Sequence, residues 1–374
     1  MKNIIRHISM LFTAVLIVAG CNIWSDYDPN GIVSELTISV AVSDTPGSPM
    51  TRAYDTRAEI NPGDYISPAH AGEMIQTLRI MILRPGTIDD KNKDTTWVVE
   101  HNRYMDFYGV SKKAYMEVNG LSFKVYGPEW KKVYLFVNEN TTKTAVDGQT
   151  QVKLVNYDFD SLAPGDEFSM QTIDNLKIIL NEESEEVPSY ALPMSECHNV
   201  KMPATDYHRD LFVTRAATKF TYIFDNQTSQ QFNLTEIIIN KGSRVEYYMP
   251  RITYNGDPLK GTFDVKDYLV PNVDNNDYYS FRKDYTTTIA ASGVTTLESI
   301  YLLEGKYTNV NDTRNYSMSV TLDENVYEEH FPDVPQLPRN THVVVVITLG
   351  EHGIDWTVDV CPYGEYWLYP DFGI

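Results

Sequence analysis

The sequence has few positive charges, and it contains none of the common catalytic signatures. It carries 31 lysines and arginines against 51 aspartates and glutamates, which gives a formal net charge of -20. A chain this acidic is repelled by phosphate backbones and anionic headgroups, so we expect no nucleic-acid partner. It holds no G-x-S-x-G elbow, P-loop, H-E-x-x-H or G-x-G-x-x-G pattern. We therefore expect no enzymatic activity, no catalytic residues and no cofactor.

Cysteine is also scarce, and the first of the three cysteines ends an N-terminal export signal. A short basic start and a mostly apolar run over residues 8–18 precede Val18-Ala19-Gly20-Cys21, whose small residues suit a signal peptidase. The apolar run is shorter than the ~20 residues of a membrane-spanning helix. We predict a lipoprotein signal peptide over residues 1–20, lipidation of Cys21, and a polar tether over residues 21–31.

The remaining cysteines suggest no metal site. Cys197 and Cys361 could form a disulfide in an oxidising compartment or stay as two thiols, and the sequence leaves both readings open. Cys197, His198 and His208 are three potential zinc ligands, whereas a structural zinc site needs four. The aspartates between Asp264 and Asp277 lack the spacing of an EF-hand loop, and a solvated loop explains them better. We predict that the chain binds no metal.

Strand-forming residues, among them 26 tyrosines, are abundant, and no long stretch shows a helical period. Apolar or alternating segments recur between turns rich in Gly, Pro, Asn and Asp. The continuous apolar run at residues 343–347 (VVVVI) should lie in a central strand, because an exposed run of this kind promotes aggregation. Strands are expected at residues 32–42, 74–83, 133–137, 176–180, 211–224, 234–240, 299–303, 316–322, 341–349 and 354–360.

The chain left after removal of the signal exceeds what one hydrophobic core usually serves. We therefore predict an all-β fold with two β-sandwich domains in tandem, transthyretin-like or Greek-key in topology, with few short helices. The boundary is expected after the prolines at 193 and 203. It divides the chain into an N-terminal domain over residues 32–208 and a C-terminal domain over residues 209–374.

The first expected strand leads into a loop that should be open to proteases. The loop over residues 43–68 is rich in proline and glycine and contains Thr51-Arg52-Ala53 and Thr56-Arg57-Ala58. From Leu36 onward the preceding strand alternates apolar and polar residues, as expected for a strand with one buried face. Its apolar residues are Ile32, Leu36, Ile38, Val40 and Val42.

Aromatic residues leave a second interpretation open. Aromatic faces can stack on sugar rings, and the candidates for such platforms are Trp24, Trp97, Trp130, Trp356 and Trp367, with many of the tyrosines. Trp97 and Trp130 are the two whose replacement would test this interpretation. Sandwich cores also use aromatic residues, so the same residues are compatible with a purely structural role. A glycan-binding surface lipoprotein is therefore the alternative to the assembly function described next.

Taken in order, these features resemble the fimbrillins of Bacteroidales, the subunits and accessory proteins of type V pili. Residues 190–195 (YALPMS) are similar to the family's "iPMs" segment, and residues 211–220 (LFVTRAATKF) to the "R-x-x-AK" strand that follows it. Residues 234–240 (LTEIIIN) and 337–342 (LPRNTH) match patterns that recur in the second domain of the family.

The resemblance implies a function in adhesive fimbriae at the cell outer membrane. In such pili a lipidated precursor is cut by an Arg-specific protease behind its first strand, and a strand from the next subunit fills the groove that is left. Here Arg52 or Arg57 is the candidate cut site, and residues 32–42 are the strand that is lost. The partners are then other fimbrial subunits, and the position in the pilus (shaft, tip or anchor) stays open.

The donor strand implied by the resemblance is the C-terminal segment, residues 356–374. This segment is apolar and aromatic at intervals, with a turn at Pro362 and Gly364. A closing strand of its own domain is the other reading of the same residues. The side chains expected to enter a neighbouring subunit are Tyr366, Leu368, Phe372 and Ile374.

Overall fold

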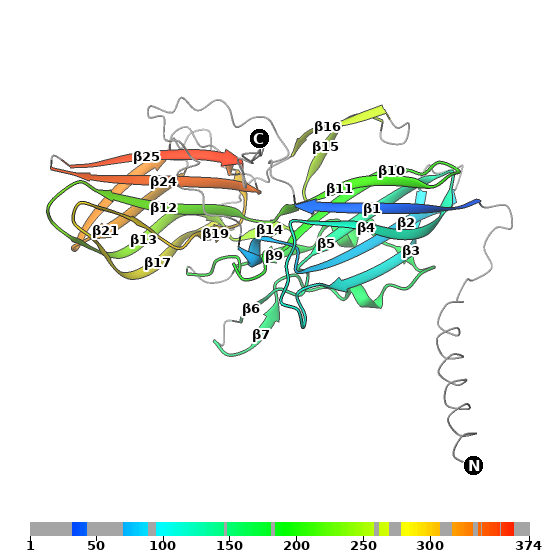
Figure 1. The fold of residues 1–374 in the computed structure, drawn as a ribbon, viewed down its shortest axis with the longest axis horizontal. Coiled ribbons are helices and arrows are strands. Elements are labelled where there is room, and N and C mark those ends of the chain that lie inside the picture. Colours follow the sequence, from blue (N-terminus) through cyan, green and yellow to red (C-terminus); the bar gives the residue numbers. More distant parts are fainter. Residues whose placement is uncertain are drawn as a thin grey trace, which may run out of the picture.

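The computed structural model describes residues 32–42, 70–88, 95–145, 148–180, 184–257, 262–268, 278–306, 316–331, 336–337, 339–351 and 353–362. Within these ranges the regular secondary structure is almost entirely β-strand, with one short α-helix, α2 (Met170–Asp174), and two 3-10 helices, η3 (Ala71–Glu73) and η4 (Phe159–Ser161). Two strand-rich domains lie end to end (Figure 1). The predicted all-β class with two tandem sandwich domains is confirmed.

The first domain is built on one continuous ladder of eight strands in the order β4-β1-β11-β10-β5-β2-β3-β8. β1 and the second half of β4 alternate buried and more exposed residues, which places one face of each in the core, whereas β2 and β5 are buried along most of their length. Their bounds are β1 (Ile32–Val42), β2 (Thr77–Ile88), β3 (Thr95–Asp106), β4 (Glu117–Gly127), β5 (Trp130–Val137), β8 (Glu167–Phe168), β10 (Met194–Lys201) and β11 (Tyr207–Arg215).

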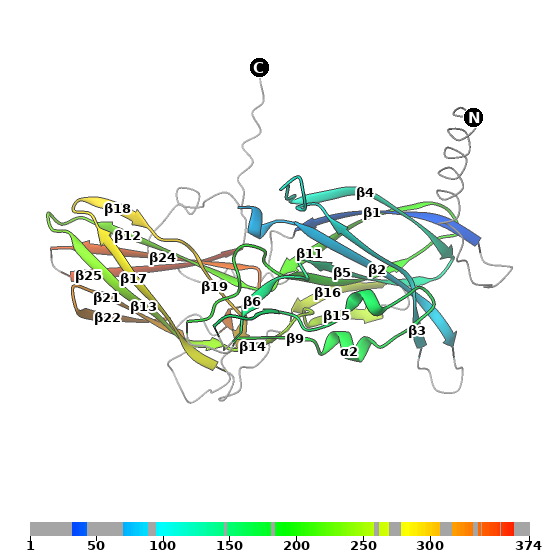
Figure 2. The same cartoon turned by 90° about the horizontal axis from the view of Figure 1, so that it is seen from below.

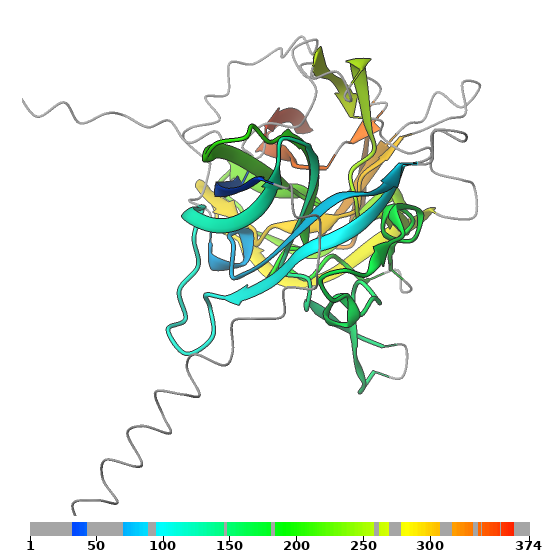
Figure 3. The same ribbon diagram turned by 90° about the vertical axis from the view of Figure 1, so that its right-hand side faces the viewer.

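This ladder bends back on itself to form the sandwich. β10 and β11 pair only at Met194 with Arg215 and at Ser195 with Thr214, so the sheet turns a corner between them. On the opposite side, β3 and β4 approach each other through the rings of His101 and Phe123, whose centroids are 5.4 Å apart. The strands therefore curl around a shared core, as the view along the molecule shows (Figure 3).

The second domain consists of two facing sheets. One has the order β18-β12-β24-β25, with β19 also paired to β12, and the other has the order β17-β13-β21-β22. The run at residues 343–347 lies in β24, between β12 and β25, so its predicted central position is confirmed. The bounds are β12 (Thr218–Asn226), β13 (Phe232–Ser243), β17 (Tyr278–Ile289), β18 (Gly293–Thr296), β19 (Ile300–Leu302), β21 (Tyr316–Leu322), β22 (Asn325–Phe331), β24 (Thr341–Gly350) and β25 (Gly353–Pro362).

Short ribbons complete the fold. β9 (Lys177–Ile179) of the first domain pairs with β14 (Val245–Tyr247) of the second, near the junction of the two domains (Figure 2). β6 (Thr142–Thr144) and β7 (Gln151–Lys153) form a hairpin that projects beside this junction (Figure 1). The remaining pairs are β15 (Ile252–Asp257) with β16 (Thr262–Tyr268), and β20 (Gly305–Lys306) with β23 (Gln336–Leu337).

Three details differ from the sequence-based expectations. Residues 211–224 do not form one strand, because the chain leaves the first domain at Arg215 and enters the second at Thr218, with Ala216 and Ala217 buried between. The expected boundary at residues 208 and 209 falls inside β11, which pairs with β1. No Gly or Pro marks the actual break, so the local sequence carried no turn signal. Asp264, expected in a loop, lies in β16.

Candidate functional site

The first strand lies inside a sheet rather than at its edge. β1 runs antiparallel to β4, from Ile32 opposite Gly127 to Ala41 opposite Glu117. On its other side it runs parallel to β11, from Leu36 opposite Tyr207 to Val42 opposite Val213. Because β1 is paired on both sides, its loss would leave unpaired backbone groups along both β4 and β11. We call this position between β4 and β11 the first-strand slot.

Four of the five apolar side chains predicted for this strand lie in the core. Leu36, Ile38 and Val40 are 0% exposed and Val42 is 4% exposed. Burial of a side chain of this size contributes about 1.5–3 kcal/mol. Ile32 is the exception: it lies at the outer end of the strand and is 49% exposed. The first-strand slot therefore accommodates four apolar side chains at alternate positions.

Polar contacts to β1 are confined to its exposed face. Glu35 accepts a hydrogen bond from the Ser122 hydroxyl at 2.9 Å, and its backbone N–H donates to Asp206 Oδ1 at 2.9 Å. Exposed contacts of this kind contribute little to stability. Backbone pairing and apolar burial thus hold β1, and any strand with the same alternation could make both.

The segment that follows the arginine-containing loop is bound to the second domain. Glu73, which ends η3, is 1% exposed, and its Oε1 atom accepts hydrogen bonds from Lys219 Nζ at 2.7 Å and from the Tyr301 hydroxyl at 2.6 Å. Arg215 Nε donates to the carbonyl of Glu73 at 3.1 Å and Arg215 Nη1 to Asn340 Oδ1 at 3.1 Å. This junction cluster keeps the chain after the loop attached independently of β1.

A second buried group at the junction is acidic. Glu246 in β14 is 2% exposed, and its Oε2 atom has no hydrogen-bond partner among the described residues. Arg339 pairs with the nearby Glu304 and donates to the carbonyls of Tyr247 and Tyr248. Burial, and next the negative charge of Glu304, raise the pKa of Glu246 from 4.5 to about 8.

This raised pKa makes the stability of the fold depend on pH. Between pH 4.5 and about 8 the folded state binds a proton at Glu246 that the unfolded state releases. The free energy of unfolding therefore falls as the pH rises through this range. We expect Glu246→Gln to match the wild type near pH 4.5 and to be the more stable of the two above pH 8. Denaturant unfolding of both proteins across this range measures the difference. A constant difference would contradict the assignment.

The predicted C-terminal donor segment, residues 356–374, has two parts that meet at Pro362. Residues 353–362 form β25, which pairs along its length with β24, from Gly350 opposite Gly353 to Thr341 opposite Pro362. Residues 356–362 are therefore a closing strand of their own domain, not a free donor. The donor-strand hypothesis is thereby restricted to residues 363–374.

Several predicted site residues lie outside the described ranges. They are Cys21, Arg52, Arg57, Tyr366, Leu368, Phe372 and Ile374.

The possible zinc ligands are not brought together. His198 Nε2 lies 2.7 Å from the carbonyl oxygen of Phe212, and His208 Nε2 lies 2.9 Å from Asp210 Oδ1. Cys197 is a free cysteine, and burial raises the pKa of its thiol to about 12. Within the part of the chain that the structure describes, no group of three or more His, Cys, Asp or Glu residues could hold a metal ion.

The tryptophans considered for sugar binding do not form a platform. Trp97 is only 5% exposed, and Lys132 Nζ lies 5.4 Å from the centroid of its ring. Trp130 is half-buried against the core. The hypothesis that Trp97 stacks on a sugar is therefore wrong, because its alternate position in β3 turns the ring inward.

No protein-family model matches the sequence. No curated protein is significantly similar to it. Among solved structures, a proposed cell adhesion protein of Parabacteroides distasonis matches with a TM-score of 0.51 and 14% identity, over 90% of this chain and 98% of that one. The chain has the fold of that protein. The resemblance to Bacteroidales surface proteins is thus confirmed at the level of the fold.

Other solved structures overlap with this chain at lower scores. The tip fimbrial protein Mfa3 of Porphyromonas gingivalis, in a form with a C-terminal truncation, gives a TM-score of 0.49 at 11% identity, over 88% of this chain and 99% of that one. A proposed cell adhesion protein of Bacteroides eggerthii gives 0.48 at 10% identity, over 91% and 98%.

Proposed function

We propose that the protein is a structural subunit of a type V-like fimbria that supports adhesion. It is exported as a lipoprotein, loses β1 by cleavage after Arg52 or Arg57, and polymerises by strand exchange. The observation that carries this proposal is the first-strand slot, in which an interior strand held mainly by backbone pairing and alternate apolar side chains precedes a segment with two arginines. The shared fold with the Parabacteroides distasonis protein supports it.

Strand addition explains how such a slot could join subunits. A donor strand pairs with both open edges, which provides affinity, while its alternate side chains enter the core and set the register. Tyr366 and Leu368 are two residues apart, as are Phe372 and Ile374, so each pair lies on one face of an extended chain. Pro370 lies on the same face, so the segment spans five alternate positions. We assign it, in a second subunit, to the five inward-facing positions of β1 from Ser34 to Val42.

The proposed partners follow from this mechanism. Before cleavage, the lipid on Cys21 holds the precursor in the outer membrane, and an Arg-specific protease then releases the first strand. The junction cluster around Glu73 keeps the new N-terminal segment folded against the second domain. Other fimbrial subunits are the lasting partners, and the role is structural rather than enzymatic.

The test is made in the bacterium that produces the protein. We expect surface material to begin at Ala53 or Ala58 by N-terminal mass measurement and to form filaments visible by electron microscopy. A chain ending at residue 365 lacks all four proposed donor side chains and should be cut but not polymerise. A lipidated Cys21 on assembled material would indicate an anchor instead. Normal filaments from the shortened chain would overturn strand donation by the C-terminus.

A further inference from the structure

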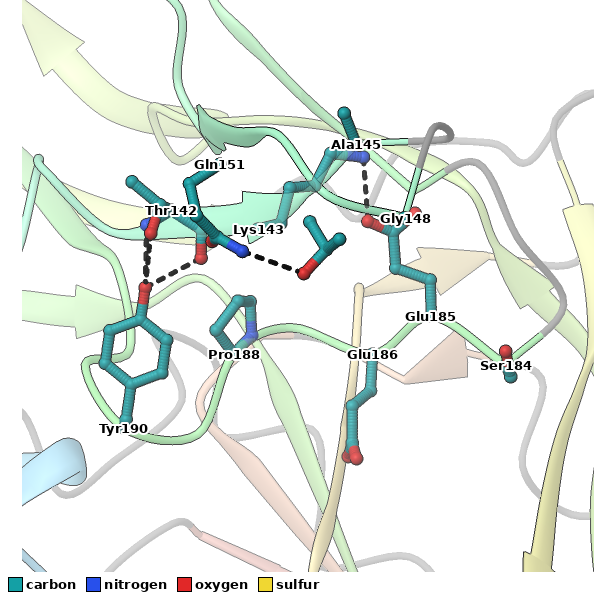
Figure 4. A pocket seen from close by; sticks show the side chains of 11 residues that line it. Thr142, Lys143, Ala145, Gly148, Gln151, Ser184, Glu185, Glu186, Pro188 and Tyr190 are labelled. Carbon is teal, nitrogen blue, oxygen red and sulfur yellow. Dashed lines mark hydrogen bonds and ion pairs between the residues drawn. The ribbon is translucent and has the colours of Figure 1, made fainter.

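A cleft with polar and apolar lining lies beside the β6–β7 hairpin, away from the first-strand slot. Its volume is about 680 Å³, within the size range of small-molecule sites. The hairpin provides one wall and the segment leading into residues 190–195 provides the other (Figure 4). The lining residues that matter for recognition are Thr142, Lys143, Gln151, Glu185, Pro188 and Tyr190.

One aromatic ring at this cleft is both exposed and held in place. Tyr190 is 57% exposed, the highest value among the exposed aromatic residues that the structure describes. Its hydroxyl donates to the carbonyl of Thr142 at 2.7 Å and accepts from the N–H of Thr142 at 2.8 Å. The Tyr190 carbonyl also accepts from Gln76 Nε2 at 2.6 Å. A ring fixed at both ends loses little conformational freedom when a ligand packs on it.

The charges in the cleft are balanced. Lys143 Nζ lies 2.8 Å from Glu185 Oε1, and the two side chains are 9% and 14% exposed. Glu186 is paired with Lys283 at 2.9 Å. Because Lys143 is already paired with a carboxylate and two carboxylates line the cleft, the cleft does not favour a phosphate, sulfate or carboxylate ligand. Gln151 Nε2 donates to Thr144 Oγ1 at 3.0 Å, which holds its amide at the rim.

We propose that this cleft binds an uncharged sugar unit of a glycan. A pyranose ring has an apolar C–H face, which would pack on Tyr190 and the neighbouring Pro188, and a rim of hydroxyl groups. The Gln151 amide would donate a hydrogen bond to one sugar hydroxyl and accept one from another. The Glu185 carboxylate would accept one more. Gln151 comes from the hairpin and Tyr190 from the opposing segment (Figure 4). The inference does not depend on strand exchange.

The test is a glycan array probed with the protein carrying its complete mature chain. The array includes neutral oligosaccharides and the same oligosaccharides with sialic acid or sulfate added. We expect binding to at least one neutral glycan, reduced tenfold or more by Tyr190→Ala and severalfold by Gln151→Ala. Gln149→Ala is the matched control, because this glutamine is exposed on the same hairpin outside the cleft. It should bind like the wild type.

Folding is checked separately for each variant by its thermal unfolding midpoint. If Tyr190→Ala unfolds, Tyr190→Phe replaces it, since this variant keeps the ring and removes only the hydroxyl contacts, and the Gln151→Ala result remains decisive. The proposal is overturned if the wild type binds no neutral glycan or binds only the charged set. It is also overturned if Gln151→Ala and Gln149→Ala reduce binding equally.

Discussion

The chain that starts at Ala58, once freed of β1, is expected to unfold at least roughly 10 °C below the intact protein. A synthetic peptide of residues 32–42 should restore the lost stability. The reason is the burial of Leu36, Ile38, Val40 and Val42, which are at most 4% exposed in the folded protein. At about 1.5–3 kcal/mol each, their loss alone removes a large share of the stability of a domain.

Backbone pairing adds to this effect. β1 pairs with β4 and β11 on both sides, so its removal exposes two edges at once, and each lost hydrogen bond costs about 0.5–1.5 kcal/mol. The thermal midpoint of the first domain, followed by circular dichroism with and without peptide, measures both the loss and the recovery.

The control is a peptide of the same length in which Leu36, Ile38 and Val40 are replaced by asparagine. It can still pair its backbone, but it would bury polar groups without partners in the core, so we expect it to restore little. Equal recovery of the thermal midpoint with both peptides would show that the first-strand slot does not select for apolar side chains. An unchanged midpoint after removal of β1 would mean that the slot is not part of the stable core.

Replacing Glu73 with alanine should cost about 3–5 kcal/mol of folding free energy. Glu73 accepts from Lys219 Nζ at 2.7 Å and from the Tyr301 hydroxyl at 2.6 Å, and Lys219 is only 6% exposed. Without this carboxylate, Lys219 loses the ion pair with Glu73 in a place that water hardly reaches. Nearby His342 cannot replace the lost negative charge, and it stays neutral because burial and the charge of Lys219 lower its pKa to about 3. Denaturant unfolding measures the cost.

Two further variants separate this effect from a general loss of contacts. The double variant Glu73→Gln with Lys219→Met removes both charges of the Glu73–Lys219 ion pair, so we expect it to recover much of the stability. Arg282→Ala removes an ion pair with Glu236 in which the arginine side chain is 54% exposed, and it should cost below about 1 kcal/mol. If Glu73→Ala costs no more than Arg282→Ala, the junction cluster does not hold the two domains together.

Local sequence patterns predicted the strands well in two cases: where one face of the strand is buried, and where both faces are buried. Residues 316–322 form β21 with the bounds expected from the sequence, and the run at residues 343–347 lies at the centre of its sheet. Prediction failed where the pattern continues through a change of domain, as at Ala216 and Ala217. It also failed for Trp97, because an aromatic residue gives no local sign of which face of its strand is covered.

By itself, the sequence determined the strand-rich class and the alternation that buries Leu36, Ile38, Val40 and Val42, because a period of two residues is a property of the local chain. Only the tertiary structure decided that β1 lies between β4 and β11, that Glu73 meets Lys219, and that residues 353–362 close their own domain. These features depend on contacts between residues far apart in the chain. The local sequence of a strand does not specify which other strand it pairs with, because that choice depends on how the rest of the sheet forms.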